Sequence, residues 1–264
     1  MRILVANDDG IHSPGIQALA QSLATDHEVY VVAPDRERSA AGHSLTLYKP
    51  LRVQEVKIDG GVVKAWSTNG TPSDGVKLAV SVLLDHKPDL VISGINRGYN
   101  LGTEVLYSGT VAAAMEGVFL GVTSIAVSQD RDGAGQNLEA ACSVMKEIVK
   151  RVAQLDVPLD LNTLINVNFP NVPLSELRGI AVTELGNRFY NDSFEHRRDP
   201  YGQDYYWLMG HAIDHNEKDT SDVVAVSQKK VSVSPVKFNM TDHSFVKQWQ
   251  NHHIFDTVLG MGAS

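Results

Sequence analysis

The chain has 264 residues, carries a formal net charge of −8 and is 43% hydrophobic, so it is long and apolar enough for one large α/β domain, alone or with an appended segment. The acidic balance argues against a nucleic acid polymer as the main partner, although it does not exclude a nucleotide bound together with a cation. The single cysteine, Cys142, rules out disulfides within the chain, and no apolar run approaches the roughly 18 residues of a membrane span, so we expect a cytoplasmic protein without a membrane partner.

Strand and helix patterns alternate over the first two-thirds of the chain. Short apolar runs predict strands at residues 3–6, 28–33, 90–93, 123–128 and 164–168. Apolar residues at helical spacing predict helices that begin near Pro14, Thr71 and Ser108, and a longer helix over residues 137–154. Residues 44–67 have a strand-like composition, with Asp59-Gly60 as a hairpin signal. This order predicts an α/β fold with a doubly wound, mainly parallel sheet and right-handed crossovers.

The pattern changes after about residue 171. Residues 184–220 are polar and aromatic with little periodicity, so we expect an irregular arm there. Residues 231–236 predict a strand and residues 243–251 a helix, while residues 223–226 fit either a strand or a short helix capped by Ser221. We therefore expect a core over residues 1–180 and a C-terminal extension over residues 181–264.

Polar side chains gather where the predicted strands end. Asn7, Asp8 and Asp9 follow the first strand. The loops after two later strands supply Asp35, Arg36, Arg38, Ser39, His43 and Ser44, and then Asn96, Arg97 and Asn100. Open parallel sheets bind ligands outside the carboxyl ends of their strands, and hard oxygen donors favour Mg²⁺, Mn²⁺ or Ca²⁺. Taken alone, Asp8 and Asp9 could equally form an acidic turn that caps the first helix.

The segment YSGTVAAAMEG, residues 107–117, is a second candidate site. Small residues at the start of an alanine-rich helix leave backbone N–H groups accessible to an anion. On this interpretation Ser108, Gly109 and Thr110 bind phosphate, and the alternative is a plain serine N-cap with small residues for close helix packing. His43, near the strand ends, is either a general acid for a leaving alkoxide or a polar loop residue.

Three other classes of α/β protein share parts of this pattern. A receiver domain needs an acceptor aspartate and a lysine at later strand ends, and the nearest acceptor, Asp59, lies in the hairpin signal. A haloacid-dehalogenase-like phosphatase needs two aspartates separated by one residue, whereas Asp8 and Asp9 are adjacent. A Rossmann dehydrogenase needs GxGxxG after the first strand, and this motif is missing.

Six stretches of the chain together resemble the SurE family, the stationary-phase survival proteins. They are NDDG (7–10), APDRERSAAGHSLTL (33–47), GTPSD (70–74), SGINRGYNLGTEVLYSGTVAAAMEG (93–117), NVNFP (166–170) and VSVSPV (231–236). The resemblance extends over nearly the whole chain and is most specific in residues 93–117. It implies a Rossmann-like core and a metal-dependent 5′/3′-nucleotidase that removes phosphate from nucleoside monophosphates, with short polyphosphate as a further substrate of some members.

The resemblance also implies a ligand set and an oligomer. One divalent ion per subunit, Mg²⁺ or Mn²⁺, would be held by Asp8, Asp9, Ser39 and Asn96. The family forms dimers or tetramers through exchanged C-terminal segments, so we expect a homodimer or homotetramer whose contacts use the extension.

Combining the residue patterns with the resemblance gives a hypothesis of metal-assisted phosphomonoester hydrolysis. Ser108, Gly109 and Thr110 would bind phosphate oxygens, while Asn7, His43 and Ser44 are candidate substrate contacts. Two questions stay open at this point. Asp8 or Asp9 could act as nucleophile or base as well as ligand, and the alternative function is a metal-dependent nucleotide or phosphate sensor without turnover.

The chain departs from the family pattern at three places. Gly75 stands where many relatives have cysteine, and Lys229-Lys230 stands where glycine followed by an aromatic residue is common. Residues from about 185 to 220 match only weakly, so the base preference of the enzyme is not predicted.

Overall fold

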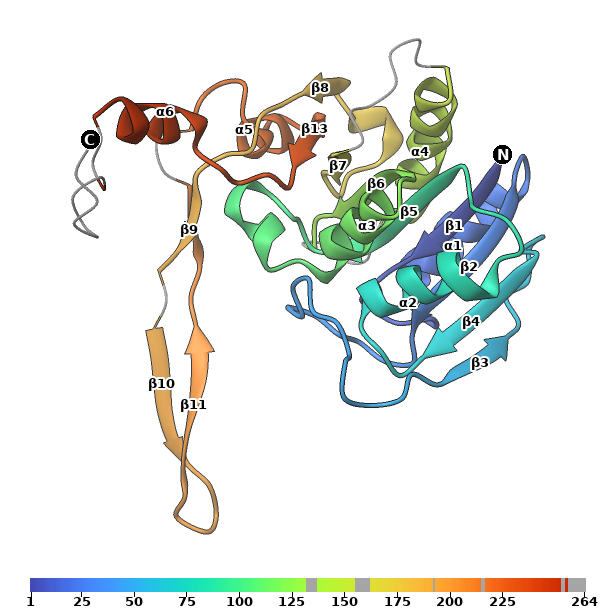
Figure 1. Cartoon of the computed structure of the whole chain (residues 1–264), viewed down its shortest axis with the longest axis horizontal. Coiled ribbons are helices and arrows are strands. Elements are labelled where there is room, and N and C mark those ends of the chain that lie inside the picture. Colours follow the sequence, from blue (N-terminus) through green and yellow to red (C-terminus); the bar gives the residue numbers. More distant parts are fainter. Residues whose placement is uncertain (132–136, 155–161, 192, 215–216, 253–254, 256–264) are drawn as a thin grey trace, which may run out of the picture.

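The protein is described by a computed structural model over residues 1–131, 137–154, 162–191, 193–214, 217–252 and 255. A nine-stranded sheet with the order β3-β4-β2-β1-β5-β6-β7-β13-β8 forms its centre (Figure 1). The strands are β1 (Arg2–Ala6), β2 (Glu28–Pro34), β3 (Val53–Val56), β4 (Lys64–Thr68), β5 (Leu90–Arg97), β6 (Thr123–Gln129), β7 (Thr163–Phe169), β8 (Ile180–Val182) and β13 (Val231–Lys237). All neighbours from β4 to β7 are parallel, which confirms the predicted α/β class and mainly parallel sheet.

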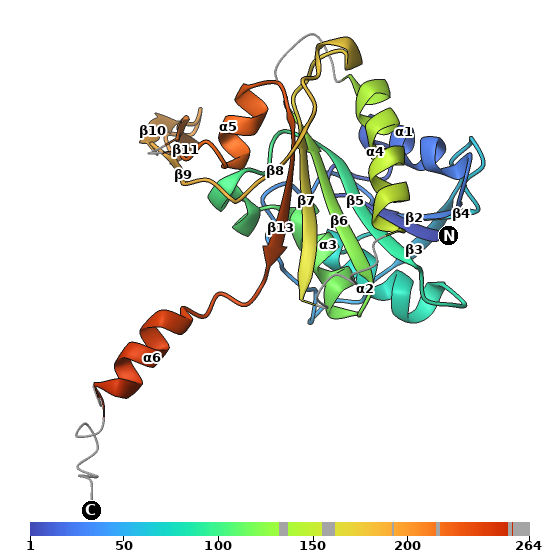
Figure 2. The same cartoon turned by 90° about the horizontal axis from the view of Figure 1, so that it is seen from above.

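Helices cover both faces of this sheet (Figure 2). Alternate residues of β1 point to opposite faces, so Ile3 packs with α1 (Pro14–Ala24) and α4 (Leu138–Val152), whereas Leu4 packs with α2 (Pro72–Leu78) and α3 (Gly109–Phe119). The remaining helical segments are η1 (Ala79–Leu83), η2 (Gly102–Leu106), η3 (Leu174–Glu176), α5 (Asp222–Ser227) and α6 (His243–Asn251). No helix in the described ranges is both long enough and apolar enough to cross a membrane.

Three of the predicted helix starts are fixed by side-chain caps. Thr71 and Asp74 form a reciprocal capping box, in which each side chain accepts a bond from the other residue's backbone N–H. Ser108 accepts from the N–H of Val111 and starts α3. Ser221 caps α5 in the same way, so the helix alternative for residues 223–226 is confirmed and the strand alternative is wrong.

The segment expected to be an irregular arm is instead a two-stage hairpin that projects from the core (Figure 1). Strands β9 (Arg188–Tyr190) and β12 (Ala212–Asp214) pair at its base, and β10 (Ser193–Arg198) and β11 (Asp204–Met209) pair farther out. Every residue of β10 and β11 is exposed, which explains why the sequence lacks the apolar alternation of a half-buried strand. The prediction of an irregular arm is therefore wrong.

The rest of the extension divides between the core and the surface. Strand β13 pairs antiparallel with β7 and parallel with β8, so it belongs to the central sheet although it follows residue 180. Helix α6 follows β13 and lies away from the sheet (Figure 2). The expected boundary between residues 180 and 181 thus falls within β8 and assigns β13, a strand of the central sheet, to the extension.

Candidate functional site

The predicted polar residues lie at the carboxyl edge of the sheet, beside its first strand. Strand β1 has β2 on one side and β5 on the other. The chain therefore builds the sheet outward from β1 in one direction through β2 and in the opposite direction through β5. Asp8 and Asp9 follow β1, the loop after β2 carries Ser39, and Asn96 lies near the end of β5. Open α/β sheets bind ligands at such a topological switch point.

Asp8 is almost completely buried, with 4% of its surface exposed. The hydroxyl of Thr110 donates a hydrogen bond of 2.5 Å to Asp8 Oδ1. Burial raises the pKa of Asp8 to about 6, although the bond from Thr110 opposes the shift. Gly109 permits this contact, because a Cβ at that position would stand 2.9 Å from both Cβ and Oδ2 of Asp8. The start of α3 therefore lies directly against the Asp8 carboxylate.

Asp9 is less buried than Asp8 and faces the end of β5. Burial raises the pKa of Asp9, while a hydrogen bond of 3.2 Å from the backbone N–H of Arg97 to Asp9 Oδ2 lowers it. Asn96 is the residue before Arg97, and its Nδ2 donates to the carbonyl of Gly98 at 2.9 Å. Asp9 and Asn96 are thus held together through the peptide unit that joins Asn96 to Arg97.

The loop after β2 reaches the aspartate pair through its backbone. The N–H of Arg38 donates to the carbonyl oxygen of Asp8 at 2.7 Å, so Ser39 follows immediately after a residue bonded to Asp8. The Ser39 hydroxyl donates to Glu37 Oε1 at 2.6 Å, and the charge of Glu37 contributes to the raised pKa of Asp9. Glu37 is an acidic neighbour of the site that the sequence motifs did not single out.

A hard cation fits this donor set. Two adjacent carboxylates have raised pKa values, which means that the surrounding protein supplies less compensation for their charge than water would. The other two predicted ligands, Ser39 and Asn96, carry neutral oxygens. No group of three or more His, Cys, Asp or Glu side chains that could hold a metal occurs among the described residues, so a cation here would need these neutral ligands.

The three residues at the start of α3 have distinct contacts. Ser108 is the N-cap, since its Oγ accepts from the N–H of Val111 at 3.1 Å. The side chain of Thr110 binds Asp8, and Gly109 provides space for that carboxylate. The backbone N–H of Thr110 also lowers the pKa of Asp8, so the positive end of α3 acts on this group.

The three candidate substrate contacts all have partners within the protein. Asn7 is fully buried and closes the turn to Gly10. Its Nδ2 donates a hydrogen bond to the carbonyl of Gly10, and its Oδ1 accepts one from the N–H of Gly10. His43 Nε2 lies 2.9 Å from Glu116 Oε2, and the carbonyl of Ser44 accepts from the hydroxyl of Thr71. The polar atoms of the Asn7 side chain are therefore engaged within this turn and with Ser13.

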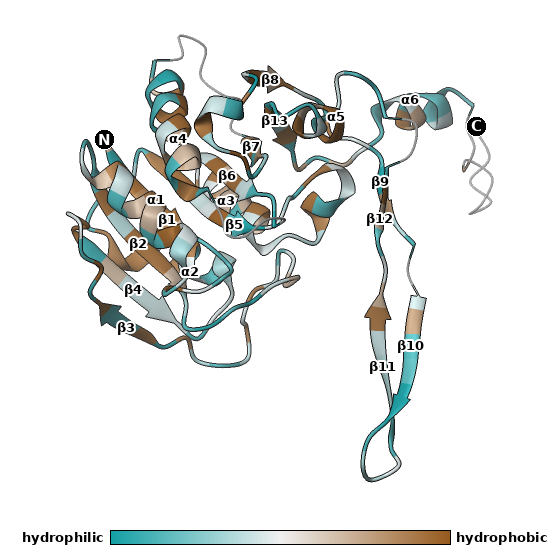
Figure 3. Ribbon diagram, turned by 180° about the vertical axis from the view of Figure 1, so that it is seen from behind, coloured by the Kyte–Doolittle hydropathy of each residue, from teal (hydrophilic) through white to brown (hydrophobic). Residues whose placement is uncertain are grey.

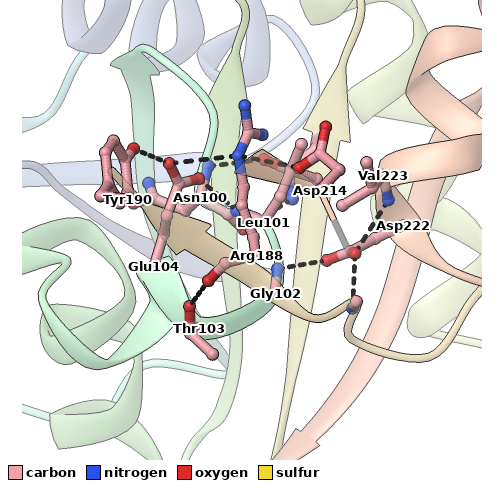
Figure 4. A network of polar contacts seen from close by, with 12 residues as sticks. Asn100, Leu101, Gly102, Thr103, Glu104, Arg188, Tyr190, Asp214, Asp222 and Val223 are labelled. Atoms are coloured by element: carbon pink, nitrogen blue, oxygen red, sulfur yellow. Dashed lines mark hydrogen bonds and ion pairs between the residues drawn. The ribbon is translucent and has the colours of Figure 1, made fainter. Parts of the chain in front are cut away.

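A second polar network holds the connection between β5 and α3 (Figure 4). Asp222, fully buried at the start of α5, accepts from the backbone N–H groups of Gly102, Gly186 and Val223 at 2.8–2.9 Å. At the base of the arm, Arg188 Nε lies 3.6 Å from Glu104 Oε1 and 3.4 Å from Asp214 Oδ1. Gly102 and Glu104 lie within the 93–117 motif, but no motif marks Arg188, Asp214 or Asp222. Their contacts tie the arm and α5 to the η2 turn that leads into Ser108.

Comparisons with known proteins agree with the geometry. The family model described as Survival protein SurE matches residues 3–192. The 5′-nucleotidase SurE of Carboxydothermus hydrogenoformans is 45% identical over 251 residues, covering 94% of each chain, and that of Gloeobacter violaceus is 48% identical over 269 residues, covering 98% of this chain and 100% of the relative. The crystal structure of the SurE protein from Aquifex aeolicus superimposes with a TM-score of 0.81 and 40% identity, covering 96% of this chain and 100% of the other.

Proposed function

The chain belongs to the SurE family, and we propose that it is a divalent-metal-dependent phosphomonoesterase that hydrolyses nucleoside monophosphates to nucleoside and phosphate. The names of its relatives, 5′-nucleotidases, support a nucleotide substrate. The observation that carries the proposal is the Asp8–Asp9 pair at the switch point, with raised pKa values and the start of α3 directed at Asp8. Such a pair suits a cation, and the helix start suits an anion beside it.

Four residues would hold one Mg²⁺ or Mn²⁺. Asp8 and Asp9 supply the negative charge, while Ser39 Oγ and Asn96 Oδ1 supply neutral oxygens. When bound, such a cation neutralises charge on a phosphoryl oxygen and lowers the pKa of a coordinated water.

The first turn of α3 would bind the phosphate. The backbone N–H groups of Gly109 and Thr110 would donate to phosphate oxygens, and the Ser108 cap fixes the start of the helix on which they stand. The hydroxyl and the backbone N–H of Thr110 both interact with Asp8, so Thr110 would act on phosphate by sharing its N–H between this carboxylate and a phosphate oxygen.

A phosphate-release assay across nucleoside monophosphates tests the function. Release from AMP or GMP should require Mn²⁺ or Mg²⁺ and be abolished by EDTA and by Asp9→Asn. Asp59→Asn is the matched control, because Asp59 is 82% exposed in a distant turn and pairs only with Lys57 among the contacts described. Tight nucleotide binding without release above the Asp8→Asn/Asp9→Asn background would instead indicate the sensor function. The same assay with tripolyphosphate tests the proposed action on short polyphosphate.

We infer that both aspartates act as ligands and that water attacks phosphorus directly. Asp8 supports this role because the Thr110 hydroxyl already holds one oxygen of its carboxylate. Hydrolysis of a monophosphate with a chiral, isotopically labelled phosphoryl group distinguishes the two routes. Direct attack inverts the configuration at phosphorus, whereas a phospho-aspartate intermediate would retain it.

We also propose that the extension forms the contacts of a homodimer or homotetramer. The arm and α6 carry hydrophobic residues among polar ones, away from the core (Figure 3). Phe194, Trp207 and Leu208 on the arm are 69%, 55% and 62% exposed, and Phe245 and Trp249 on α6 are about half exposed. Clusters of this kind mark protein interfaces. Light scattering should give two or four chains for the wild type and a smaller particle for Phe245→Asp/Trp249→Asp.

A further inference from the structure

Glu116 is a buried carboxylate that the proposed chemistry does not use. It lies on α3, its side chain is 3% exposed, and it has two partners from other elements. His43 Nε2 lies 2.9 Å from Glu116 Oε2, and Lys77 Nζ lies 2.6 Å from Glu116 Oε1. Burial alone would raise the pKa of Glu116, but His43 and Lys77 together hold it below its ordinary value. The carboxylate is therefore charged and shared between two partners.

This cluster joins three elements around the site. Lys77 is on α2, Glu116 is on α3, and His43 is in the loop after β2. The His43 ring also stacks on Phe119, with centroids 5.3 Å apart and planes 7° apart. One face of the ring is thus covered and one nitrogen is engaged, which fixes the position of this loop residue against α3.

The same loop carries Ser39. Its backbone is bonded to the protein on both sides of Ser39, by Arg38 N–H to the carbonyl of Asp8 and by Gly42 N–H to the carbonyl of Tyr107. Farther along, Thr46 N–H donates to the carboxylate of Asp74. His43 supplies a side-chain contact between these backbone bonds, next to Gly42.

We propose that His43 and Glu116 are positioning residues that hold residues 38–46 against α3 and so place Ser39 beside Asp8 and Asp9. The inference rests on the proposed function, since it assigns Ser39 to the cation. It replaces the interpretation of His43 as general acid, because Nε2 is bound to Glu116 and the ring is packed on Phe119. Lys77 neutralises the remaining charge of Glu116.

Hydrogen exchange followed by mass spectrometry tests the positioning role without relying on activity. In the metal-free protein, the amides of residues 38–46 should exchange about tenfold faster in His43→Ala and Glu116→Gln than in the wild type, as expected for loss of roughly 1.4 kcal/mol of local stability. Peptides from β1 and β5 should be unchanged, which shows that the variants are folded. His86→Ala, an exposed histidine in the connection before β5, is the matched control.

Calorimetry and kinetics complete the test. The dissociation constant for Mn²⁺ should rise about tenfold in both variants, because Ser39 occupies its ligand position for a smaller fraction of the time when the loop is less firmly held. At saturating Mn²⁺, hydrolysis of AMP and of p-nitrophenyl phosphate should fall by the same small factor. An unchanged loop exchange, or a selective loss with AMP, whose alkoxide needs a proton, would overturn the positioning role. Absence of turnover in the wild type would contradict the proposed function, while the exchange and binding data would still decide the role of His43.

Discussion

The hydroxyl of Thr110 donates a hydrogen bond of 2.5 Å to Oδ1 of Asp8, and this bond joins the first turn of α3 to the end of β1. It connects residues that are 102 positions apart in the sequence. Because the same helix start would bind phosphate and the same carboxylate would bind a cation, this contact fixes the spacing between the two proposed subsites.

Asp8 should destabilise the metal-free protein at neutral pH. Its folded pKa of about 6 lies above the ordinary value of 3.8, so the folded protein loses stability as pH rises from about 4 to 6 and the group ionises. A shift of this size corresponds to roughly 3 kcal/mol. In EDTA at pH 8, Asp8→Asn should therefore be more stable than the wild type by up to about 3 kcal/mol, with little difference at pH 4.

Urea unfolding at the two pH values measures this effect. Asp59→Asn is the control and should behave as the wild type at both, because Asp59 is exposed. Saturating Mn²⁺ should then stabilise the wild type and not Asp8→Asn. Equal stability of Asp8→Asn and the wild type at both pH values would contradict the buried, ionised state assigned to Asp8.

Gly109→Ala should disable the site with little effect on the rest of the fold. The new Cβ would stand 2.9 Å from Asp8 Cβ and Oδ2, so either the carboxylate or the helix start must move. We expect a loss of Mn²⁺ affinity and of phosphate release of at least about tenfold. Gly75→Ala in α2 is the control, since its Cβ meets Val32 Cγ2 at 3.4 Å and alanine favours a helix. Similar activity in the two variants would show that the space beside Asp8 is not required.

Cys142 should be chemically inert in the folded protein. It lies in α4 with 7% of its surface exposed, and burial raises the pKa of its thiol to about 11. At pH 8 the thiolate would be about a hundredfold rarer than for a thiol with the ordinary pKa of 9. Labelling of the native protein by iodoacetamide should be negligible at pH 8. Labelling should be complete in roughly 8 M urea, where the protein is unfolded. Rapid labelling of native protein would show that α4 opens or that Cys142 is accessible.

Asp222 should be essential for stability around the η2 turn. Asp222→Ala leaves the N–H groups of Gly102, Gly186 and Val223 without their carboxylate acceptor, and we expect a loss of about 3 kcal/mol or more in the free energy of unfolding. Asp219→Ala, at an exposed position just before α5, is the control. Limited proteolysis should also cleave the arm base faster in Asp222→Ala. Unchanged unfolding and cleavage would contradict the role assigned to this network.

The central strands could be predicted because they are buried on both faces. Runs such as residues 3–6 are uniformly apolar, and their order with the helices predicts the parallel topology. The end of β5 was predicted at Ser93, but the strand continues past an irregularity to Arg97, where Asn96 pairs with Ser128. Polar residues at a strand end do not distinguish a loop from a continuing strand. The arm strands were missed for the opposite reason, since neither of their faces is buried.

The candidate site was predicted only in part. Asp8, Asp9, Ser39 and Asn96 stood out because strand ends and family motifs mark them, and the structure brings these regions together through Arg38 and Arg97. Glu116 was missed because its partners, His43 and Lys77, are 73 and 39 residues away. An acid on the buried face of an alanine-rich helix was the available signal. Contacts at such separations follow from tertiary packing and leave no local pattern.

Direct measurement of Mn²⁺ binding by electron paramagnetic resonance tests the central claim, that the end of β1 holds a cation used for phosphate chemistry. The wild type should bind one Mn²⁺ per chain with oxygen ligands only, and Asp8→Asn/Asp9→Asn should bind none at the same concentration. Adding AMP should place a phosphate oxygen in the coordination sphere of the bound ion, which is detected as hyperfine coupling between Mn²⁺ and phosphorus. Equally tight Mn²⁺ binding by the double variant, or nitrogen coordination from a histidine, would contradict the site.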